Sequence, residues 1–376
     1  AGSFWDYSLH DKAAYRHKFA RMERVGTTSM GGLSYAFHFD AGLYAKLLRE
    51  YSKANGVRRV EGIFDRVIKV ADSGDVTALV IRDGTEIAGD LFVDCTGFRS
   101  RLLGQEFDVG FQDWSQYLPC NSAVTIGCER QEPLLPYTKA IAHEAGWQWR
   151  IPLQHRIGNG HVFCDKYMSV DEATSKLMSN LDGKPIGEPR ALKFKTGRRE
   201  KLWVKNVVGI GLASGFLEPL ESTSIHFIQS NISNLIDLLP RRAIHSALRD
   251  EYNRQVCEEF DLVRDFLILH YHINQRSEPF WTAMREMDVP QSLKDKMDLF
   301  RAGGRIYRQP QDLFRDTSWV QVMMGQGLIP EDYHPMADRI SVAELDEFLK
   351  NVSDIARKAS EQLPSHADFV AKIVNA

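Results

Sequence analysis

The stretch NVVGIGLASGFLEPLESTSIHFIQ, residues 206–229, places a buried strand, a polar turn and the start of a helix in direct succession. Residues 207–212 form an apolar run flanked by small residues, which predicts the strand, while Ile225, Ile228 and Ile232 recur at helical spacing. Where a strand runs into a helix N-terminus, unpaired N–H groups can receive an anion or an electron-rich cofactor edge. The stretch therefore predicts either an ordinary capped helix or one wall of a binding site.

The polar turn inside this stretch holds the best candidates for chemistry. Glu221 has mostly apolar neighbours, which predicts a desolvated carboxyl group suited to proton transfer. Glu218 is its rival, and a solvated loop carboxylate is an equally open interpretation of that residue. Thr223 and Ser224 bring backbone N–H donors to the helix start, a suitable place for a halide or an oxyanion. The alternative for this turn is a simple N-cap formed by Ser222 or Thr223.

A second conspicuous stretch is GWQWRIP, residues 146–152. Trp147 and Trp149 are two residues apart, so on a strand both rings point to the same face. Pro152 then removes a backbone donor and restricts the chain that follows. Both rings are either core filler or, because only seven tryptophans occur in the chain, a wall beside a site.

Composition narrows the class of partner. The 376 residues carry 47 Lys and Arg against 50 Asp and Glu, so no basic excess favours nucleic acid or an anionic membrane. No apolar run approaches the roughly 20 residues that span a bilayer. The five cysteines form no CxxC pair, and free thiols fit a reducing compartment. We expect a cytoplasmic protein that acts on a small molecule.

The order of predicted elements indicates a mixed α/β fold with a helical C-terminal region. We expect a first unit at residues 1–240 and a helical, substrate-side region at residues 241–376 that is continuous with it. Expected strands are 57–60, 66–70, 76–82, 86–93, 122–128, 147–151 and 160–165. Expected helices are 40–56, 170–180, 241–274, 279–287, 291–301, 318–325, 342–358 and 365–374.

Several common site types have no motif in this chain. His270 and His272 are two residues apart and diverge on a helix, so we expect no metal site there. No GxSxG elbow or Walker A loop occurs, which argues against the commonest hydrolases and phosphoryl-transfer enzymes. No GxGxxG loop follows an early strand either.

Two motifs in the correct order carry a resemblance to a known family. GWQWRIP matches the GWxWxIP motif of flavin-dependent halogenases, and FLEPLESTSIHFIQ matches the segment that holds their catalytic Glu and chloride site. The chain thus resembles the flavin-dependent tryptophan halogenases along its whole length. The resemblance implies an FAD-dependent, aromatic-hydroxylase-like sheet domain.

The resemblance also implies roles for individual residues. Glu221 matches the catalytic Glu, and Thr223 and Ser224 match the halide-binding positions. At one of these, Ser224, the tryptophan-specific members have Gly. The positions that match FAD-binding residues are Leu212, Ser222, Ile225 and Phe64. The positions that match the motif beside the tunnel between flavin and substrate are Trp147, Trp149 and Pro152.

The implied reaction uses reduced FAD, O2 and chloride or bromide to make hypohalous acid, which halogenates an electron-rich aromatic such as tryptophan or indole. A separate flavin reductase supplies the reduced FAD, and a homodimer is a possible assembly. Trp319 is a candidate to stack on the substrate, with core packing as the alternative.

The resemblance is incomplete at one end. The family's N-terminal segment, with its GxGxxG loop and catalytic Lys, has no counterpart here, so we expect weakened FAD binding in the chain as it stands. Two alternatives remain open at this point: an FAD-dependent aromatic monooxygenase, which shares motifs such as GDLFVDCTG, and a truncated, non-catalytic fragment of the halogenase fold.

Overall fold

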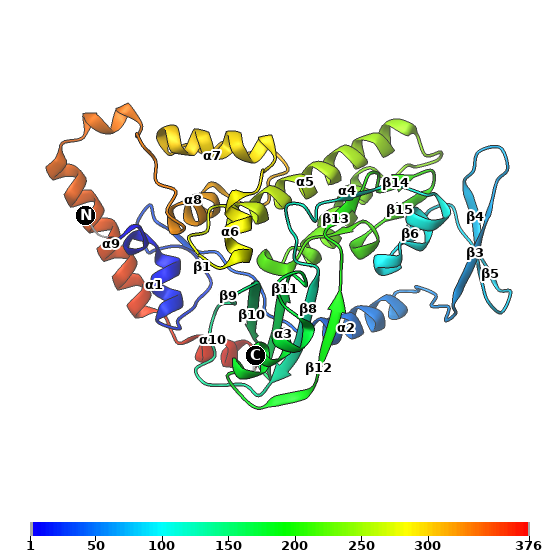
Figure 1. Ribbon diagram of the computed structural model, residues 1–376, viewed down its shortest axis with the longest axis horizontal. Coiled ribbons are helices and arrows are strands. Elements are labelled where there is room, and N and C mark those ends of the chain that lie inside the picture. The colour runs from blue at the N-terminus through cyan, green and yellow to red at the C-terminus, as the bar shows by residue number, and fades with distance from the viewer. Residues whose placement is uncertain (1–2, 375–376) are drawn as a thin grey trace.

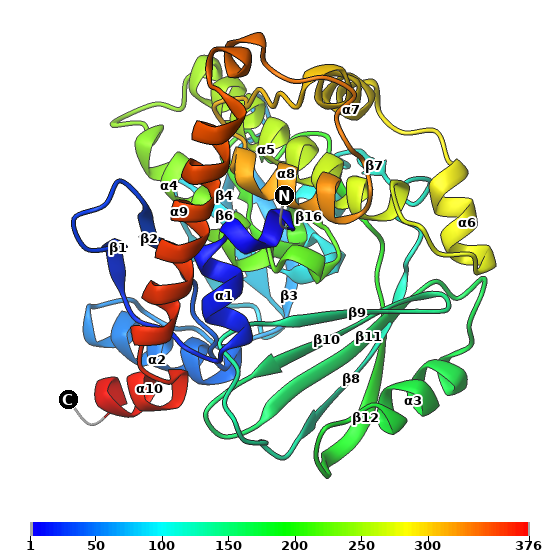
Figure 2. The ribbon, with the colours of Figure 1, turned by 90° about the vertical axis from the view of Figure 1, so that its left-hand side faces the viewer.

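A five-stranded antiparallel sheet carries the GWQWRIP strand near one edge. Its order is β12-β8-β11-β10-β9 in the computed structural model, which describes residues 3–374 (Figure 1). The strands are β8 (Ser122–Cys128), β9 (Lys139–His143), β10 (Gly146–Pro152), β11 (Ile157–Phe163) and β12 (Pro185–Lys193). Helix α3 (Val170–Ser179) packs on β8 and β11 and covers one face of the sheet (Figure 2).

The burial of β10 changes along its length. Gly146, Trp147 and Gln148 are buried, whereas the four residues from Trp149 to Pro152 are partly exposed. Trp149 lies opposite Gly160 of β11, where a Cβ atom would come within 2.0 Å of the indole ring. Gly160 therefore leaves the space that the Trp149 ring occupies.

A parallel strand pair forms the base of the stretch at 206–229. β6 (Phe92–Asp94) pairs with β15 (Val207–Gly209), and both chains then enter short turns, η2 (Gly97–Arg99) and η4 (Gly211–Ala213), which pack together. Asp94 is fully buried, and its carboxylate accepts hydrogen bonds from the N–H groups of Thr96, Leu102 and Leu103. This carboxylate fixes the turn that follows β6.

Smaller elements complete the sheet region. β3 (Phe64–Lys69), β4 (Val76–Ile81) and β5 (Glu86–Ala88) form a separate antiparallel sheet at the right of Figure 1, and helix α2 (Ala41–Ala54) precedes this sheet in the chain. The remaining elements are the π-helical turn η3 (Arg101–Glu106) and strands β7 (Phe111–Asp113), β13 (Gly197–Arg199), β14 (Trp203–Val204) and β16 (Gly215–Phe216).

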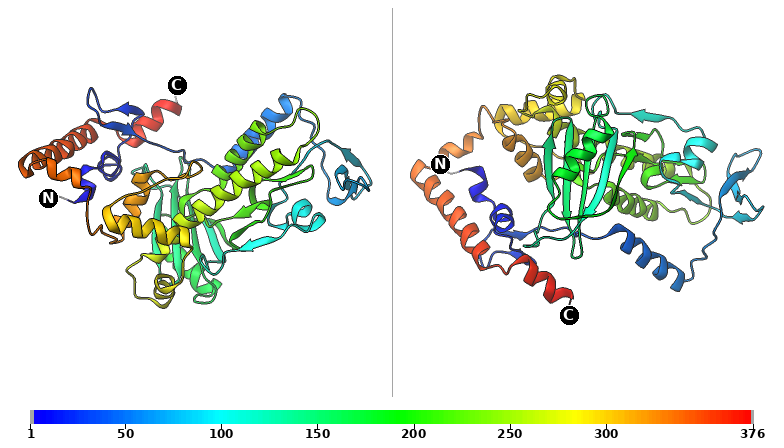
Figure 3. Two further views of the ribbon diagram at one scale, coloured as in Figure 1. Left: turned by 90° about the horizontal axis from the view of Figure 1, so that it is seen from above. Right: turned by 60° about the horizontal axis from the view of Figure 1, so that its bottom comes forward.

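The helical region packs onto the sheet region through a shared core. Helix α5 (Ser246–His272) contacts α4 (Ser224–Asp237) on one side and the later helices on the other, as seen from above in Figure 3. These helices are α6 (Pro279–Glu286), α7 (Gln291–Gly303) and α8 (Asp316–Gly325). One apolar cluster runs from Trp114 to Met323 and so spans both regions.

The two ends of the described chain lie together. η1 (Phe4–Tyr7) and α1 (Leu9–Tyr15) pack against α9 (Val342–Gln362), which follows η6 (Pro335–Arg339) (Figure 2). β1 (Met22–Arg24), β2 (Gly31–Leu33) and α10 (His366–Val374) complete this unit. Its own small core consists of Leu9, Ala13, Leu33, Ala356 and Leu363.

The structure confirms the mixed α/β fold and most of the predicted elements. The strand predicted at 57–60 is wrong, because these residues are exposed and pair with no strand. The strand predicted at 86–93 is divided into β5 and β6, which belong to different sheets. Among residues 3–374, none of the helices combines the length and the apolar run that crossing a bilayer requires.

Candidate active site

The buried end of β10 meets the turn that carries the two candidate carboxylates. Trp147 is 3% exposed, and its ring centroid lies 5.9 Å from that of Trp149 at an interplanar angle of 53°. The indole Nε1 of Trp147 is buried without a hydrogen-bond partner in the described chain. The two rings therefore form a tilted pair on one face of the strand, as the sequence predicts.

Glu218, the residue just before η5 (Pro219–Glu221), lies at the centre of this site. It is 0% exposed, and neither of its carboxyl oxygens has a hydrogen-bond partner among residues 3–374. Burial raises its pKa to about 7. The polar side chains of Tyr271, Trp147 and Cys120 lie nearby and act in the opposite direction, because they favour the ionised carboxylate. The interpretation of Glu218 as a solvated loop carboxylate is wrong, because it is the deeply buried member of the pair.

Glu221 is more accessible and has a specific partner on α5. Its Oε1 lies 2.9 Å from Nε2 of His270, whose Nδ1 lies 2.8 Å from the backbone oxygen of Phe266. Because that backbone oxygen can only accept, Nδ1 carries a proton. The Nε2 atom therefore faces the carboxyl group of Glu221, and Glu221 and His270 form a close pair that joins the turn to α5.

The start of α4 offers donors without partners. Thr223 is the N-cap residue and is 2% exposed, yet its hydroxyl makes no capping hydrogen bond and has no partner in the described chain. Ser222 adopts the left-handed conformation, with φ of 54°, so the chain turns sharply before the helix. Ser224 is the first helical residue, and its amide is one of the N–H groups left free by helix geometry. These groups fit a small anion.

The predicted flavin-contacting residues fall into two groups. Leu212 is 39% exposed in η4, and η4 packs against α4, which brings it towards Ser222 and Ile225. Nearby Gly97 has φ of +71° and faces open space, so the surface leaves room for a planar ring. Phe64 belongs to the separate β3 sheet, where the Arg101 guanidinium lies 5.0 Å from its ring centroid. The apolar surface and the open glycine fit a flavin ring.

Trp319 and Pro152 lie outside the turn that carries Glu218 and Glu221. Trp319 is 0% exposed in α8, with the Phe266 ring 4.8 Å away and the Lys296 ammonium 3.8 Å from its own ring centroid. That surrounding favours the core-packing alternative for Trp319. Pro152 lies at the other end of β10, about 17 Å along the strand from Trp147. Its backbone oxygen is hydrogen-bonded to His38 Nδ1 at 3.1 Å.

Sequence reasoning missed the α5 side of the site. His270 and Tyr271 lie about 50 residues after Glu221, and Cys120 lies about 100 residues before it, so no local spacing connects them. The hydroxyl of Tyr271 lies 3.7 Å from the thiol of Cys120. The only sequence signal is that His270 and Phe266 share one helical face of α5. Within residues 3–374, no three His, Cys, Asp or Glu side chains gather as a metal site.

Comparison with known proteins adds an independent line of evidence. A family model described as tryptophan halogenase matches residues 1–342. The chain is 36% identical over 369 residues to tryptophan 6-halogenase ThaL of Streptomyces albogriseolus, covering 90% of this chain and 68% of the relative.

Solved structures give the same result. Xcc4156, a flavin-dependent halogenase from Xanthomonas campestris, is 46% identical with a TM-score of 0.95, covering 99% of this chain and 74% of its own. BrvH, a flavin-dependent halogenase from Brevundimonas sp. BAL3, is 40% identical with a TM-score of 0.96, covering 99% and 76%.

Proposed function

The chain belongs to the tryptophan halogenase family, and from this premise we propose that it halogenates an indole-type arene. The proposed site is the turn that carries Glu221, beside the Trp147 end of β10. It is a flavin-dependent halogenase, which uses FAD and halide. The observation that carries the proposal is the 2.9 Å contact between Glu221 and His270, which lies beside the buried carboxyl group of Glu218.

The residues that would hold the cofactor and the halide are those at the start of α4. Leu212, Ser222 and Ile225 would contact the flavin ring, and the backbone N–H groups of Thr223 and Ser224 would hold chloride or bromide. When bound, reduced FAD supplies with O2 the oxidising power that converts halide to hypohalous acid. The chain's part is to position these groups and to keep water away. In this assignment, Phe64 would contact the adenine end of FAD.

Glu221 and His270 would handle protons during halogenation. Halogenation of an arene by hypohalous acid forms a carbon–halogen bond, breaks a carbon–hydrogen bond and releases water. In this step His270 would give a proton from Nε2 to the departing hydroxide, while the carboxylate of Glu221 would take the proton that leaves the ring carbon and pass it to His270. Atoms and charges balance, and the pair returns to its starting state.

Glu218 and Trp147 would keep this site dry and fixed in shape. Both are almost fully buried, and Glu218 comes directly before the turn that ends at Glu221. Because its pKa is raised to about 7, Glu218 places less negative charge near Glu221 than an ordinary carboxylate would. We assign Glu218 as a positioning residue and Trp147, with Trp149, as the wall beside the reactive space.

The names of the relatives support a proposed class of substrate. The relatives include tryptophan 6-halogenases, and we propose tryptophan or free indole as the arene. Family members act on small aromatic substrates and receive reduced FAD from a separate flavin reductase.

Three further predictions belong to this proposal. We assign residues 1–240 to the FAD-binding core and 241–376 to the substrate side. A homodimer is supported by exposed apolar residues on α2 and α4, such as Leu47, Tyr51 and Ile236. A cytoplasmic location is supported by the five cysteines, which are all free thiols.

The test is product formation from indole with a flavin reductase, FAD and NADH, with and without bromide, followed by mass spectrometry. We expect bromoindole that depends on bromide. Hydroxylated indole formed without halide would favour the aromatic monooxygenase instead. No product, under conditions where a known halogenase is active, would favour a non-catalytic fragment.

A further inference from the structure

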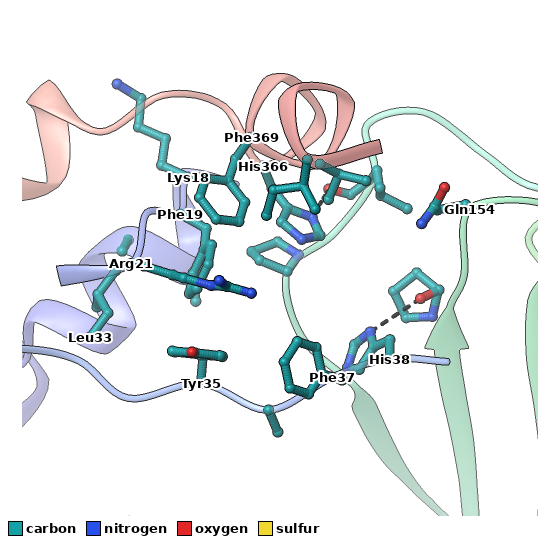
Figure 4. A pocket seen from close by; sticks show the side chains of 18 of the residues that line it. Lys18, Phe19, Arg21, Leu33, Tyr35, Phe37, His38, Gln154, His366 and Phe369 are labelled. Carbon is teal, nitrogen blue, oxygen red and sulfur yellow. Dashed lines mark hydrogen bonds between the residues drawn. The ribbon is translucent and has the colours of Figure 1, made fainter. Parts of the chain in front are cut away.

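The partly exposed end of β10 opens into a cavity of about 420 Å³, whose lining includes neither Glu218 nor Glu221. Its walls come from the segment after α1, the segment after β2, helix α10 and the chain that follows Pro152 (Figure 4). We call it the α10 cavity. Its volume lies in the range of small-molecule sites.

Aromatic rings form much of the wall of the α10 cavity. The Phe19 ring lies 4.9 Å from that of Phe369 and 5.8 Å from that of Tyr35, which in turn lies 5.7 Å from Phe37. Tyr35 is 50% exposed and Phe37 is 67% exposed, although large apolar rings are usually covered. Uncovered rings that surround a hollow favour a flat, apolar ligand.

The charge of the cavity is positive. None of the described residues that line it is acidic, whereas Lys18 and Arg21 both line it. The ammonium of Lys18 donates to the backbone oxygen of Glu361 and points away from the hollow (Figure 4). Arg21 extends into the hollow and lies 5.3 Å from the Tyr35 ring centroid. It has no carboxylate partner among residues 3–374.

The histidines of the cavity add polarity without charge near neutral pH. Burial lowers the pKa of His10, His38 and His366, the three histidines that line the cavity. His38 is hydrogen-bonded through both ring nitrogens, to Pro152 and Thr138, and His366 is hydrogen-bonded to the backbone oxygen of Leu134. Arg21 is therefore the group left to recognise a negative charge.

We propose that the α10 cavity is a binding site for an aromatic carboxylate, with the carboxylate on Arg21 and the ring among Phe19, Tyr35 and Phe37. An Arg guanidinium can bind a carboxylate through two parallel hydrogen bonds, which gives both affinity and orientation. The site goes beyond the proposed function, because it lies at the end of β10 opposite to Trp147 and includes neither candidate carboxylate.

The experiment uses the full chain and indole-3-acetate as the probe, titrated by isothermal calorimetry. We expect saturable binding that Arg21→Gln weakens by about tenfold or more, since a charge-assisted hydrogen bond is lost. Phe37→Ala should also weaken it, and because Phe37 is mostly exposed this change should leave the fold intact. Arg24→Gln is the matched control, because Arg24 is an exposed arginine on β1 outside the cavity. It should bind like the wild type.

Further titrations separate the α10 cavity from nonspecific binding and from the candidate active site. Acetate without a ring should bind much more weakly than indole-3-acetate. Any binding of indole, the proposed substrate at the Glu221 site, should not depend on Arg21. Glu221→Gln should leave the affinity unchanged. The proposal is overturned if no saturable binding occurs, if Arg21→Gln binds indole-3-acetate normally, if acetate alone binds equally well, or if only Glu221→Gln weakens binding.

Discussion

The two ends of β10 differ in their burial, in their charge and in the side chains that surround them. At the Trp147 end the strand is buried, and it faces a carboxyl group of raised pKa, a phenol and a thiol deep in the large core. At the Pro152 end the strand is partly exposed and leads into the α10 cavity, whose positive charge is open to solvent. A reactive oxidant needs the first environment, since exclusion of water strengthens electrostatic positioning. Reversible binding of an anion needs only the second.

The largest predicted difference between the two ends is in stability. Trp147→Ala removes a ring that is 3% exposed, so we expect the free energy of unfolding to fall by about 3–5 kcal/mol. Pro152→Ala changes a partly exposed residue, and we expect less than about 1 kcal/mol. Urea denaturation of both variants gives the comparison. Equal effects would mean that the ends of β10 do not differ in packing.

The next largest predicted effect is a pH-dependent change in the free energy of unfolding. It should arise only at the Trp147 end of β10. The pKa of Glu218 in the folded protein is about 7, above its ordinary value of 4.5. The folded state therefore keeps a proton that the unfolded chain releases, and this group lowers stability as the pH rises from about 4.5 to about 7. The fall amounts to roughly 3 kcal/mol.

Glu218→Gln removes this contribution, because glutamine is neutral at every pH and close in shape. The measurement is urea denaturation of both proteins from pH 4.5 to 7.5. The advantage of the wild type over the variant should shrink by roughly 3 kcal/mol across this range. Parallel stability curves would show that Glu218 does not titrate in this window.

A smaller effect should follow from removing the partner of Glu221. His270→Gln can still donate a hydrogen bond to the carboxylate, but its side chain can neither give up nor take a proton. We expect kcat for indole halogenation to fall about tenfold with KM little changed, and the pH dependence of kcat to change shape. An unchanged pH profile would assign His270 a purely structural role.

The sequence predicts this contrast only in part. Periodicity and turn residues locate β8, β10, α3 and α5 closely, because each has a strong apolar pattern bounded by Gly, Pro or capping residues. Exposed strands such as β12 escape prediction, since they lack an apolar face. The stretch at 57–60 has β-branched residues but finds no partner strand, and strand pairing is not a local property.

The candidate site shows the same limit. GWQWRIP and the residues around Glu221 are recognisable because their spacing is local. Which of the two carboxyl groups is buried depends on contacts with Tyr271 and Cys120, which lie far away in sequence. The partner of Glu221 likewise comes from a helix 49 residues further along the chain. The apolar neighbours in the sequence therefore predict that Glu221 is the desolvated carboxyl group, although Glu218 is the more deeply buried of the two.

The most direct test of the central claim is the rate of halogenated indole formation by Glu221→Gln, measured with a flavin reductase and bromide. Glutamine keeps the size of the side chain but can neither share nor accept the proton. We expect the rate to fall by about a thousandfold, with flavin binding, followed by fluorescence, largely intact. A variant that halogenates indole at nearly the wild-type rate would contradict the assignment of catalysis to Glu221, beside the Trp147 end of β10.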